Sequence, residues 1–395
     1  MSENDRWLLP QGIEEVLPEQ AARLDQLRRS LLDLFSSWGY ELVMPPFIDF
    51  LESLLTGTGK DLELQTFKLT DELTGRMMGI RADMTPQVAR IDAHHLEQDV
   101  PVRMCYLETV LVTRPQEFSG SRSPIQVGAE LYGYAGVESD VEVLRLMLQA
   151  LTVTGIKEVH VDIGHVGIFR GLARQANLNE TQEATLFDAL QRKAQPEIDT
   201  FLASLQVDNK LRQMLASLPD LNGDTTMLGR ARSALKGSTD DVQAALDDLE
   251  KIAQALQRYI PDTPLYFDLA ELRGYAYHTG IVFAAYVLGR GQAIAWGGRY
   301  DDIGQVFGRA RPATGFSMDL KSLVLLSPDD NGQISGIFAP DSDDPELQQM
   351  MKLLRSKGER VICELPDQKG GAREMECDRE LQKIDGKWTI VDVKN

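Results

Sequence analysis

The chain has 395 residues, of which 43% are hydrophobic, and it carries 41 Lys and Arg against 60 Asp and Glu, a formal net charge of −19. This length allows two or three domains with a sizeable core, and the apolar content is ordinary for a globular protein in water. A chain this acidic without a basic run is expected to repel the phosphates of nucleic acid, and no segment approaches the roughly 18 apolar residues of a membrane span.

In chain order, the first part alternates helices and strands. Residues 18–38 carry leucines at helical spacing, opened by a proline and closed by a glycine, which predicts an amphipathic helix. A strand is expected over 40–44. A second helix is expected over 141–151, capped by the pair Ser139-Asp140, and residues 159–163 alternate as a short strand does.

The middle of the chain is different in character. From 166 to 260 it is poor in strand signals and rich in Ala, Leu, Gln and Asp at helical spacing, which predicts an inserted helical domain. Strands return at 265–269 and 281–287. The glycine-containing turn at 289–292 leads into a further strand at 293–296, so an antiparallel hairpin is expected.

The composition at 327–332 predicts a linker, and a small α/β tail is expected beyond it. Its strands would lie at 334–338 and 361–365, with a helix at 345–357 between them. The predicted domains are a first core part (1–165), a helical insertion (166–260), a second core part (261–326), and the linker with a short tail domain (327–395).

Four blocks carry the most specific information. They read Gly-Tyr-Glu-Leu-Val-Met-Pro-Pro at 39–46, Ile-Arg-Ala-Asp-Met-Thr-Pro-Gln at 80–87, Arg-Pro-Gln at 114–116 with Arg-Ser-Pro-Ile-Gln-Val-Gly-Ala-Glu-Leu-Tyr-Gly at 122–133, and Leu-Arg-Gly-Tyr-Ala-Tyr-His-Thr-Gly at 272–280, followed by Gly-Gly-Arg-Tyr-Asp at 297–301. In order and spacing they resemble the histidyl-tRNA synthetases, a class II family. The resemblance implies an α+β fold: a class II aminoacyl-tRNA synthetase-like antiparallel sheet flanked by helices, with a helical insertion and a short C-terminal α/β tail.

The chain departs from the synthetases where they hold ATP. Lys321-Ser322 replaces the Glu-Arg pair that opens their last catalytic helix, and the arginine of their second motif falls in Leu111-Val112. Arginine forks bind phosphate oxygens bidentately, and a serine cannot do so. The loss of one preorganised donor costs about 3 kcal/mol of transition-state stabilisation, so the loss of two should abolish adenylate formation. The chain in this respect resembles the regulatory subunits of ATP phosphoribosyltransferase, which keep the histidine blocks and lack these arginines.

Free histidine has an ammonium group, a carboxylate and an imidazole, so a selective pocket needs anions, a cation and polar groups. Residues 125–132 alternate, which places a glycine between an amide and a carboxylate on one face; a merely solvated face is the alternative that the pattern leaves open. The resemblance implies a histidine site in which Asp83, Thr85 and Glu130 meet the ammonium, Arg273 the carboxylate, and Gln126, Tyr277 and His278 the ring or its neighbours.

Two of these positions have plainer alternatives. His278 stands where the synthetases have a tyrosine, and a buried histidine with satisfied hydrogen bonds is the simpler reading. Arg273 could form a structural ion pair with Asp268 or Glu271.

The resemblance implies no catalytic residue, cofactor or metal in this chain. It implies a partner, the short catalytic subunit of ATP phosphoribosyltransferase, which the chain would activate and make sensitive to histidine, with a self-dimer joining catalytic dimers in a hetero-octamer. Cys105, Cys363 and Cys377 lack metal-site spacing and fit a reducing compartment, and the first residues lack a signal core, so we expect a cytoplasmic protein. A histidine-activating enzyme and a histidine sensor with another partner remain as alternatives.

Overall fold

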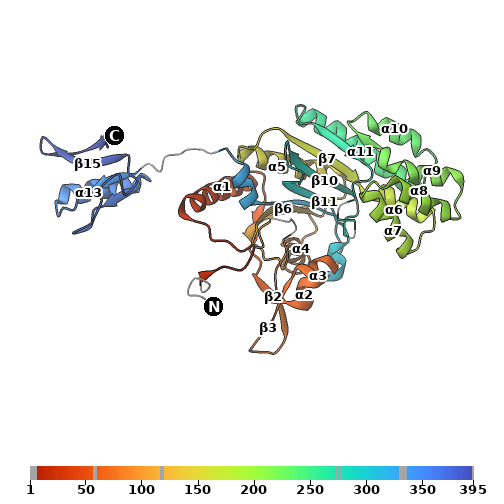
Figure 1. The fold of residues 1–395 in the computed structure, drawn as a ribbon, viewed down its shortest axis with the longest axis horizontal. Helices are drawn as coiled ribbons and strands as arrows, with labels where there is room; N and C mark the ends of the chain where they lie inside the picture. The colour runs from red at the N-terminus through yellow and green to blue at the C-terminus, as the bar shows by residue number, and fades with distance from the viewer. Residues whose placement is uncertain are drawn as a thin grey trace. The chain divides into compact units, whose positions relative to one another are not determined.

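The structure is a computed structural model that describes residues 7–56, 60–115, 120–272, 274–275, 277–328 and 336–393. It divides into two compact units, Met1–Ser327 and Pro328–Asn395, drawn in Figure 1. None of the helices in the described residues is long and apolar enough to cross a membrane.

The first unit is built on a large sheet whose strands are mostly antiparallel. Only the pairs β1–β5 and β7–β9 among its described strands run parallel. In spatial order the strands are β1 (Glu41–Leu42), β5 (Val102–Thr109), β6 (Ile125–Tyr132), β12 (Ala313–Asp319), β11 (Ala295–Arg299), β10 (Ile281–Val287), β7 (Val159–His165), β9 (Leu265–Asp268) and β8 (Asn222–Gly223). This architecture confirms the predicted fold class, including the β10–β11 hairpin.

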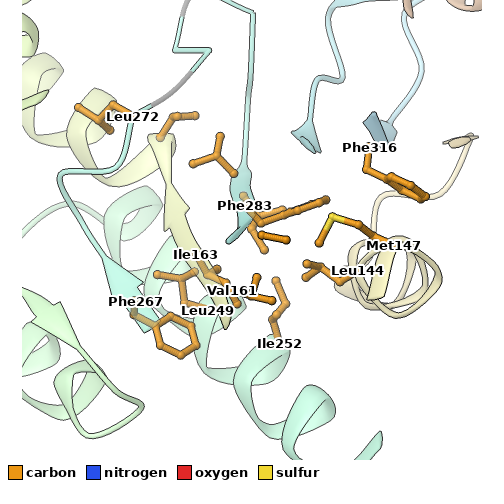
Figure 2. Close-up of a cluster of buried hydrophobic side chains, with 14 of the residues drawn as sticks. Leu144, Met147, Val161, Ile163, Leu249, Ile252, Phe267, Leu272, Phe283 and Phe316 are labelled. Carbon is orange, nitrogen blue, oxygen red and sulfur yellow. The ribbon is translucent and has the colours of Figure 1, made fainter. Parts of the chain in front are cut away.

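Helices α1 (Pro18–Ser37), α5 (Val137–Val153) and α12 (Leu320–Leu326) contribute buried side chains to the core on the sheet. Helix α11 (Asp240–Tyr259) joins the same core through Leu249 and Ile252. Figure 2 shows these two side chains beside Val161 and Ile163 of β7. The long helical stretch is thus packed on the sheet through its last helix.

The rest of that stretch consists mainly of short helices, with the edge strand β8 among them. They are α6 (Val166–Gln175), α7 (Glu180–Gln191), α8 (Gln195–Ser204), α9 (Asn209–Ser217), the 3-10 turn Leu218–Asp220 and α10 (Met227–Ala234). Helix α7 begins with a capping box, in which Asn179 accepts from the Gln182 amide and Gln182 accepts from the Asn179 amide. The insertion boundaries at 166 and 260 stay a prediction.

A small sheet and two short helices are formed by the part of the chain between the first two sequence blocks. The sheet has the order β2 (Ile48–Phe50), β4 (Met77–Ile80), β3 (Phe67–Thr70) and is accompanied by α2 (Leu51–Leu55) and α3 (Lys60–Gln65). Helix α4 (Thr85–Ile91) follows it and continues into a π-helical turn, Asp92–Leu96. A 3-10 turn, Ile303–Phe307, lies after β11.

The second unit is a small α/β fold. Its sheet has the order β14 (Val361–Cys363), β13 (Ile337–Ala339), β15 (Arg379–Ile384), β16 (Lys387–Asp392), and α13 (Pro345–Ser356) packs on it through Leu347, Met351 and Leu354. The β15–β16 hairpin was not predicted from the sequence.

One predicted helix start is wrong. Helix α5 begins at Val137 with Gly136 as its N-cap, so Ser139 and Asp140 lie inside the first turn and do not cap it. Both are buried, and the guanidinium of Arg299 in β11 forms an ion pair with Asp140 and donates a hydrogen bond to the Ser139 hydroxyl. The strand predicted at 40–44 is shorter, since only Glu41–Leu42 pairs with β5.

Candidate functional site

A pocket of about 750 Å³ opens on the face of the central sheet formed by β6, β12 and β11. Its walls come from the 82–86 segment, from 274–278, from the 290–294 loop and from helix α7. The described lining includes Asp83, Thr85, Gln126, Glu130, Tyr277 and His278. The structure therefore brings together six of the seven residues singled out in the sequence, and the seventh, Arg273, lies outside the described residues.

Glycines from three adjacent strands lie in or next to the pocket, where Gly298 and Gly315 line it and Gly128 lies against the Tyr106 hydroxyl. A Cβ added at Gly315 would lie 1.5 Å from Glu130 Oε2, and one at Gly128 would lie 2.5 Å from the Tyr106 hydroxyl. At Gly298 the nearest side-chain atom, from His278, would be 2.8 Å away. Any larger residue would displace these side chains. The glycines thus allow a carboxylate, a phenol and an imidazole to lie directly on the sheet.

Glu130 is buried at the bottom of the pocket, with 1% of its surface exposed. Its carboxylate accepts hydrogen bonds from the hydroxyls of Tyr106 (3.0 Å), Thr85 (3.2 Å) and Tyr300. Burial raises the pKa of Glu130 to about 8, against the opposing effect of the tyrosine hydroxyls, and the nearby charge of Asp83 raises it further. A cationic group placed beside this carboxyl would favour its ionised form.

Asp83 is held at the N-terminal end of α4 by a short network. The Gln126 amide nitrogen donates to Asp83 Oδ1 (2.9 Å), and the backbone amide of Thr85 donates to the same oxygen (3.0 Å). The Gln126 amide oxygen accepts from the Met84 backbone amide (2.9 Å). Gln126 thus has both ends of its amide bonded within the protein, and its evident effect is to orient Asp83.

Tyr277 and His278 form the opposite side of the pocket. Their rings lie 4.3 Å apart between centroids, with Tyr277 45% exposed and His278 only 5% exposed. The backbone turns sharply here, because Gly274 has φ +67° and its carbonyl accepts from the amides of both Tyr277 and His278. This turn fixes the position of His278 above Gly298.

The two positions where synthetases carry ATP-binding arginines also line this pocket. Val112 is apolar and 4% exposed, and the Ser322 hydroxyl donates to Asp319 Oδ2 (2.7 Å). The Lys321 ammonium does not substitute for the lost arginine, since it is buried and bonded to Glu14 (3.0 Å) and Ser123 (3.2 Å). Among the described lining residues, Arg290 of the 290–294 loop supplies the one guanidinium.

The sequence did not identify several residues of the site, among them two tyrosines and two residues of helix α7. Tyr106 and Tyr300 donate to Glu130, and Phe187 and Gln191 of α7 line the pocket. Tyr300 lies within the block at 297–301, so its place in that motif was a usable signal. Phe187 and Gln191 carry no local signal, because their pattern is that of an ordinary amphipathic helix.

Two family models match the chain. The model described as histidyl-tRNA synthetase matches residues 12–323, and the model described as ATP phosphoribosyltransferase subunit HisZ C-terminal domain matches residues 334–391. The chain is 59% identical to the ATP phosphoribosyltransferase regulatory subunit of Thioalkalivibrio sulfidiphilus, over 100% of both chains. It is 56% identical to the protein of the same name from Alkalilimnicola ehrlichii, over 98% of this chain and 96% of that one.

Solved structures match the chain at lower identity. A Bacillus halodurans protein titled ATP phosphoribosyltransferase regulatory subunit/histidyl-tRNA synthetase superposes with a TM-score of 0.83 at 27% identity, over 95% of this chain and 97% of that one. A histidyl-tRNA synthetase from a Nostoc species superposes with a TM-score of 0.78 at 19% identity, over 98% and 97% of the two chains, and this likeness concerns the fold alone.

Proposed function

The chain belongs to the family of ATP phosphoribosyltransferase regulatory subunits, which are the non-catalytic partners in an enzyme of histidine biosynthesis. We propose that it binds L-histidine as a regulatory ligand in the pocket lined by Asp83 and Glu130. Histidine bound there would inhibit the short catalytic subunit, which the chain activates when the pocket is empty. The binding residues would be Asp83, Thr85, Gln126, Glu130, Arg273, Tyr277 and His278.

The observation that carries this proposal is the pair of carboxylates, Asp83 and Glu130, in one pocket. Each is oriented by protein donors, Asp83 by Gln126 and Glu130 by hydroxyls, so neither needs to move to meet an ammonium group. A preorganised site of this kind avoids the entropic cost of ordering its side chains when the ligand binds. The histidine ammonium would provide the positive charge that the two carboxylates favour.

Val112 and Ser322 support the view that histidine is bound here without being activated. They leave the part of the pocket that would hold ATP with neutral side chains at both synthetase arginine positions. We propose accordingly that the chain forms no adenylate and binds no tRNA.

The assembly we propose contains a self-dimer of this chain together with catalytic dimers, in a cytoplasmic hetero-octamer. Exposed apolar side chains support the self-dimer. Leu42, Met44, Phe47 and Ile48, in and after the first sequence block, are each 40% or more exposed, which is the pattern of a surface that another chain covers.

Histidine binding is tested by calorimetry on the full chain. Glu130→Gln should weaken binding by about 2 kcal/mol, roughly thirtyfold, because it removes a charged partner of the ligand. Glu138→Gln is the matched control, since Glu138 is an exposed glutamate whose side chain bonds Tyr134 away from the pocket. Equal affinity of Glu130→Gln and the parent would show that histidine does not bind in this pocket.

The partner proposal is tested by mixing the chain with a short catalytic subunit and measuring phosphoribosyl-ATP formation and elution from a sizing column. We expect a larger complex and a raised rate, which histidine then lowers. No complex and no change of rate would refute the assignment of this partner. Histidine-dependent exchange of pyrophosphate into ATP by the chain alone would instead identify it as a histidine-activating enzyme.

A further inference from the structure

Helix α7 provides part of the pocket wall although it lies in the helical stretch outside the sequence blocks. Phe187 and Gln191 line the pocket, while Leu186, Ala189 and Leu190 on the same helix are buried in the helices' own core. The helix therefore has two packed faces, one toward its neighbouring helices and one toward the site.

Tyr275 is the side chain that joins the 274–278 turn to these helices. Its ring lies 5.3 Å from the ring of Phe169 in α6 and 5.1 Å from that of Phe187 in α7, measured between centroids. The guanidinium of Arg170 lies 4.6 Å from the Tyr275 centroid and donates to the Tyr275 carbonyl. The Tyr275 hydroxyl donates to the Glu183 carboxylate of α7. The turn is thus bonded to α6 and α7 by ring contacts, a cation–π contact and two hydrogen bonds.

His278, at the end of this turn, also lines the pocket. The carbonyl of Gly274 accepts from the amides of Tyr277 and His278, so hydrogen bonds connect the residues on either side of Tyr275. A Cβ at Gly274 would lie 2.4 Å from His278 Nδ1, so the imidazole packs against the turn itself. A displacement of His278 by an entering ligand would therefore be transmitted to Tyr275, and from Tyr275 to Glu183 and Phe187.

We propose that helix α7 is the closing wall of the ligand pocket, with Phe187 and Gln191 as further ligand-contacting residues and the Tyr275–Glu183 bond as the link that moves the helix when the pocket fills. This inference rests on the proposed function, because it takes L-histidine as the ligand. It adds that the helical stretch responds to the ligand directly. The movement of α7 would then change a surface made of helices α7 and α8, which are well separated in sequence from the strands of the site.

The test is hydrogen exchange on the full chain with and without L-histidine, read at the amides of α7, together with calorimetry on variants. We expect histidine to slow exchange in Glu180–Gln191. Phe187→Ala should weaken histidine binding about tenfold, since it removes a ring from the wall. Tyr275→Phe keeps the ring and removes the hydroxyl, so it should bind histidine within about threefold of the parent but lose the slowed exchange in α7.

Tyr266→Phe is the matched control, because the Tyr266 hydroxyl donates to Asn222 outside the pocket. It should behave as the parent in both measurements. If the parent binds histidine but exchange in α7 is unchanged, or if Phe187→Ala binds as tightly as the parent, the inference is wrong and the proposed histidine pocket stands. If the parent binds no histidine, the proposed function is wrong and the inference is lost with it. The exchange measurement on the parent needs no variant, so it decides the matter even if Phe187→Ala fails to fold.

Discussion

The buried carboxyl of Glu130 should make the stability of this protein fall as pH rises. Burial raises its pKa from an ordinary 4.5 to about 8. A group whose pKa is higher in the folded state stabilises fully below its unfolded pKa, and that contribution is lost as pH rises through the folded pKa. For these two values the loss between pH 6 and pH 9 amounts to about 3 kcal/mol of unfolding free energy.

The change to make is Glu130→Gln, which keeps the shape of the side chain and removes its titration. Urea unfolding of both chains at pH 6 and pH 9, without histidine, gives four free energies. The parent should lose about 3 kcal/mol more than the variant across this interval. Burial also raises the pKa of Asp140 to about 6 and lowers the pKa of His165 to about 4. Both groups are present in the parent and in the variant, so their contributions cancel when the two pH-dependent losses of unfolding free energy are subtracted. A parent and a variant with the same pH dependence would show that Glu130 ionises normally and that its burial and its hydroxyl donors are misdescribed.

Three further outcomes follow from the same site. Histidine binding should release a proton between pH 6.5 and 8, because the ligand's ammonium group lowers the raised pKa of Glu130. Calorimetry in buffers of different ionisation enthalpy should detect this proton in the parent and not in Glu130→Gln. Gly315→Ala should lose histidine binding and stability together, since its Cβ would lie 1.5 Å from Glu130 Oε2. Gly229→Ala is the control, because a Cβ there meets nothing within 4 Å. Equal histidine binding by the two variants would contradict the role given to Gly315. Arg299→Ala should destabilise the fold by about 3 to 5 kcal/mol in urea unfolding, because it leaves the buried Asp140 carboxylate without its charged partner, and a loss below 1 kcal/mol would speak against that ion pair.

The sequence predicted the fold class because its blocks are tied to particular strands and turns. The alternation at 125–132 gave β6 and its polar face, and the apolar spacing at 18–38 gave α1. These signals are local, since each depends on the period of one helix or one strand. The predicted boundaries failed where a distant partner decides them, as at α5, where Arg299 from another strand buries Asp140 and the helix starts earlier at Val137.

The small sheet β2–β4–β3 and the β15–β16 hairpin illustrate the other limit. Strands β2, β3 and β4 have only three or four residues each, so even the alternation of β3 is too short to separate a strand from a loop. Strand β15 has no strict alternation of buried and exposed residues, which leaves the hairpin without a clear period in its first strand. In the site, the blocks identified six lining residues, but they could not identify Phe187 or the bonds of Gln126. Contacts between elements distant in sequence are set by tertiary packing, which a single chain does not display in its local pattern.

The losses of arginine and the retention of carboxylates have a combined physical consequence. A synthetase couples its amino-acid site to chemistry because the two substrates share one pocket with opposite charges arranged for each. Here Asp83 and Glu130 remain in the pocket, while Val112 and Ser322 stand at the two positions where synthetases carry their ATP-binding arginines. On the proposed function, binding of an amino acid would have no chemical step to drive, and its free energy would be available only to shift a conformational equilibrium. Such shifts are typically about 1 to 3 kcal/mol, and we propose that they pass from the pocket to the helix through the Tyr275–Glu183 bond and the ring contact of Phe187 with Tyr275.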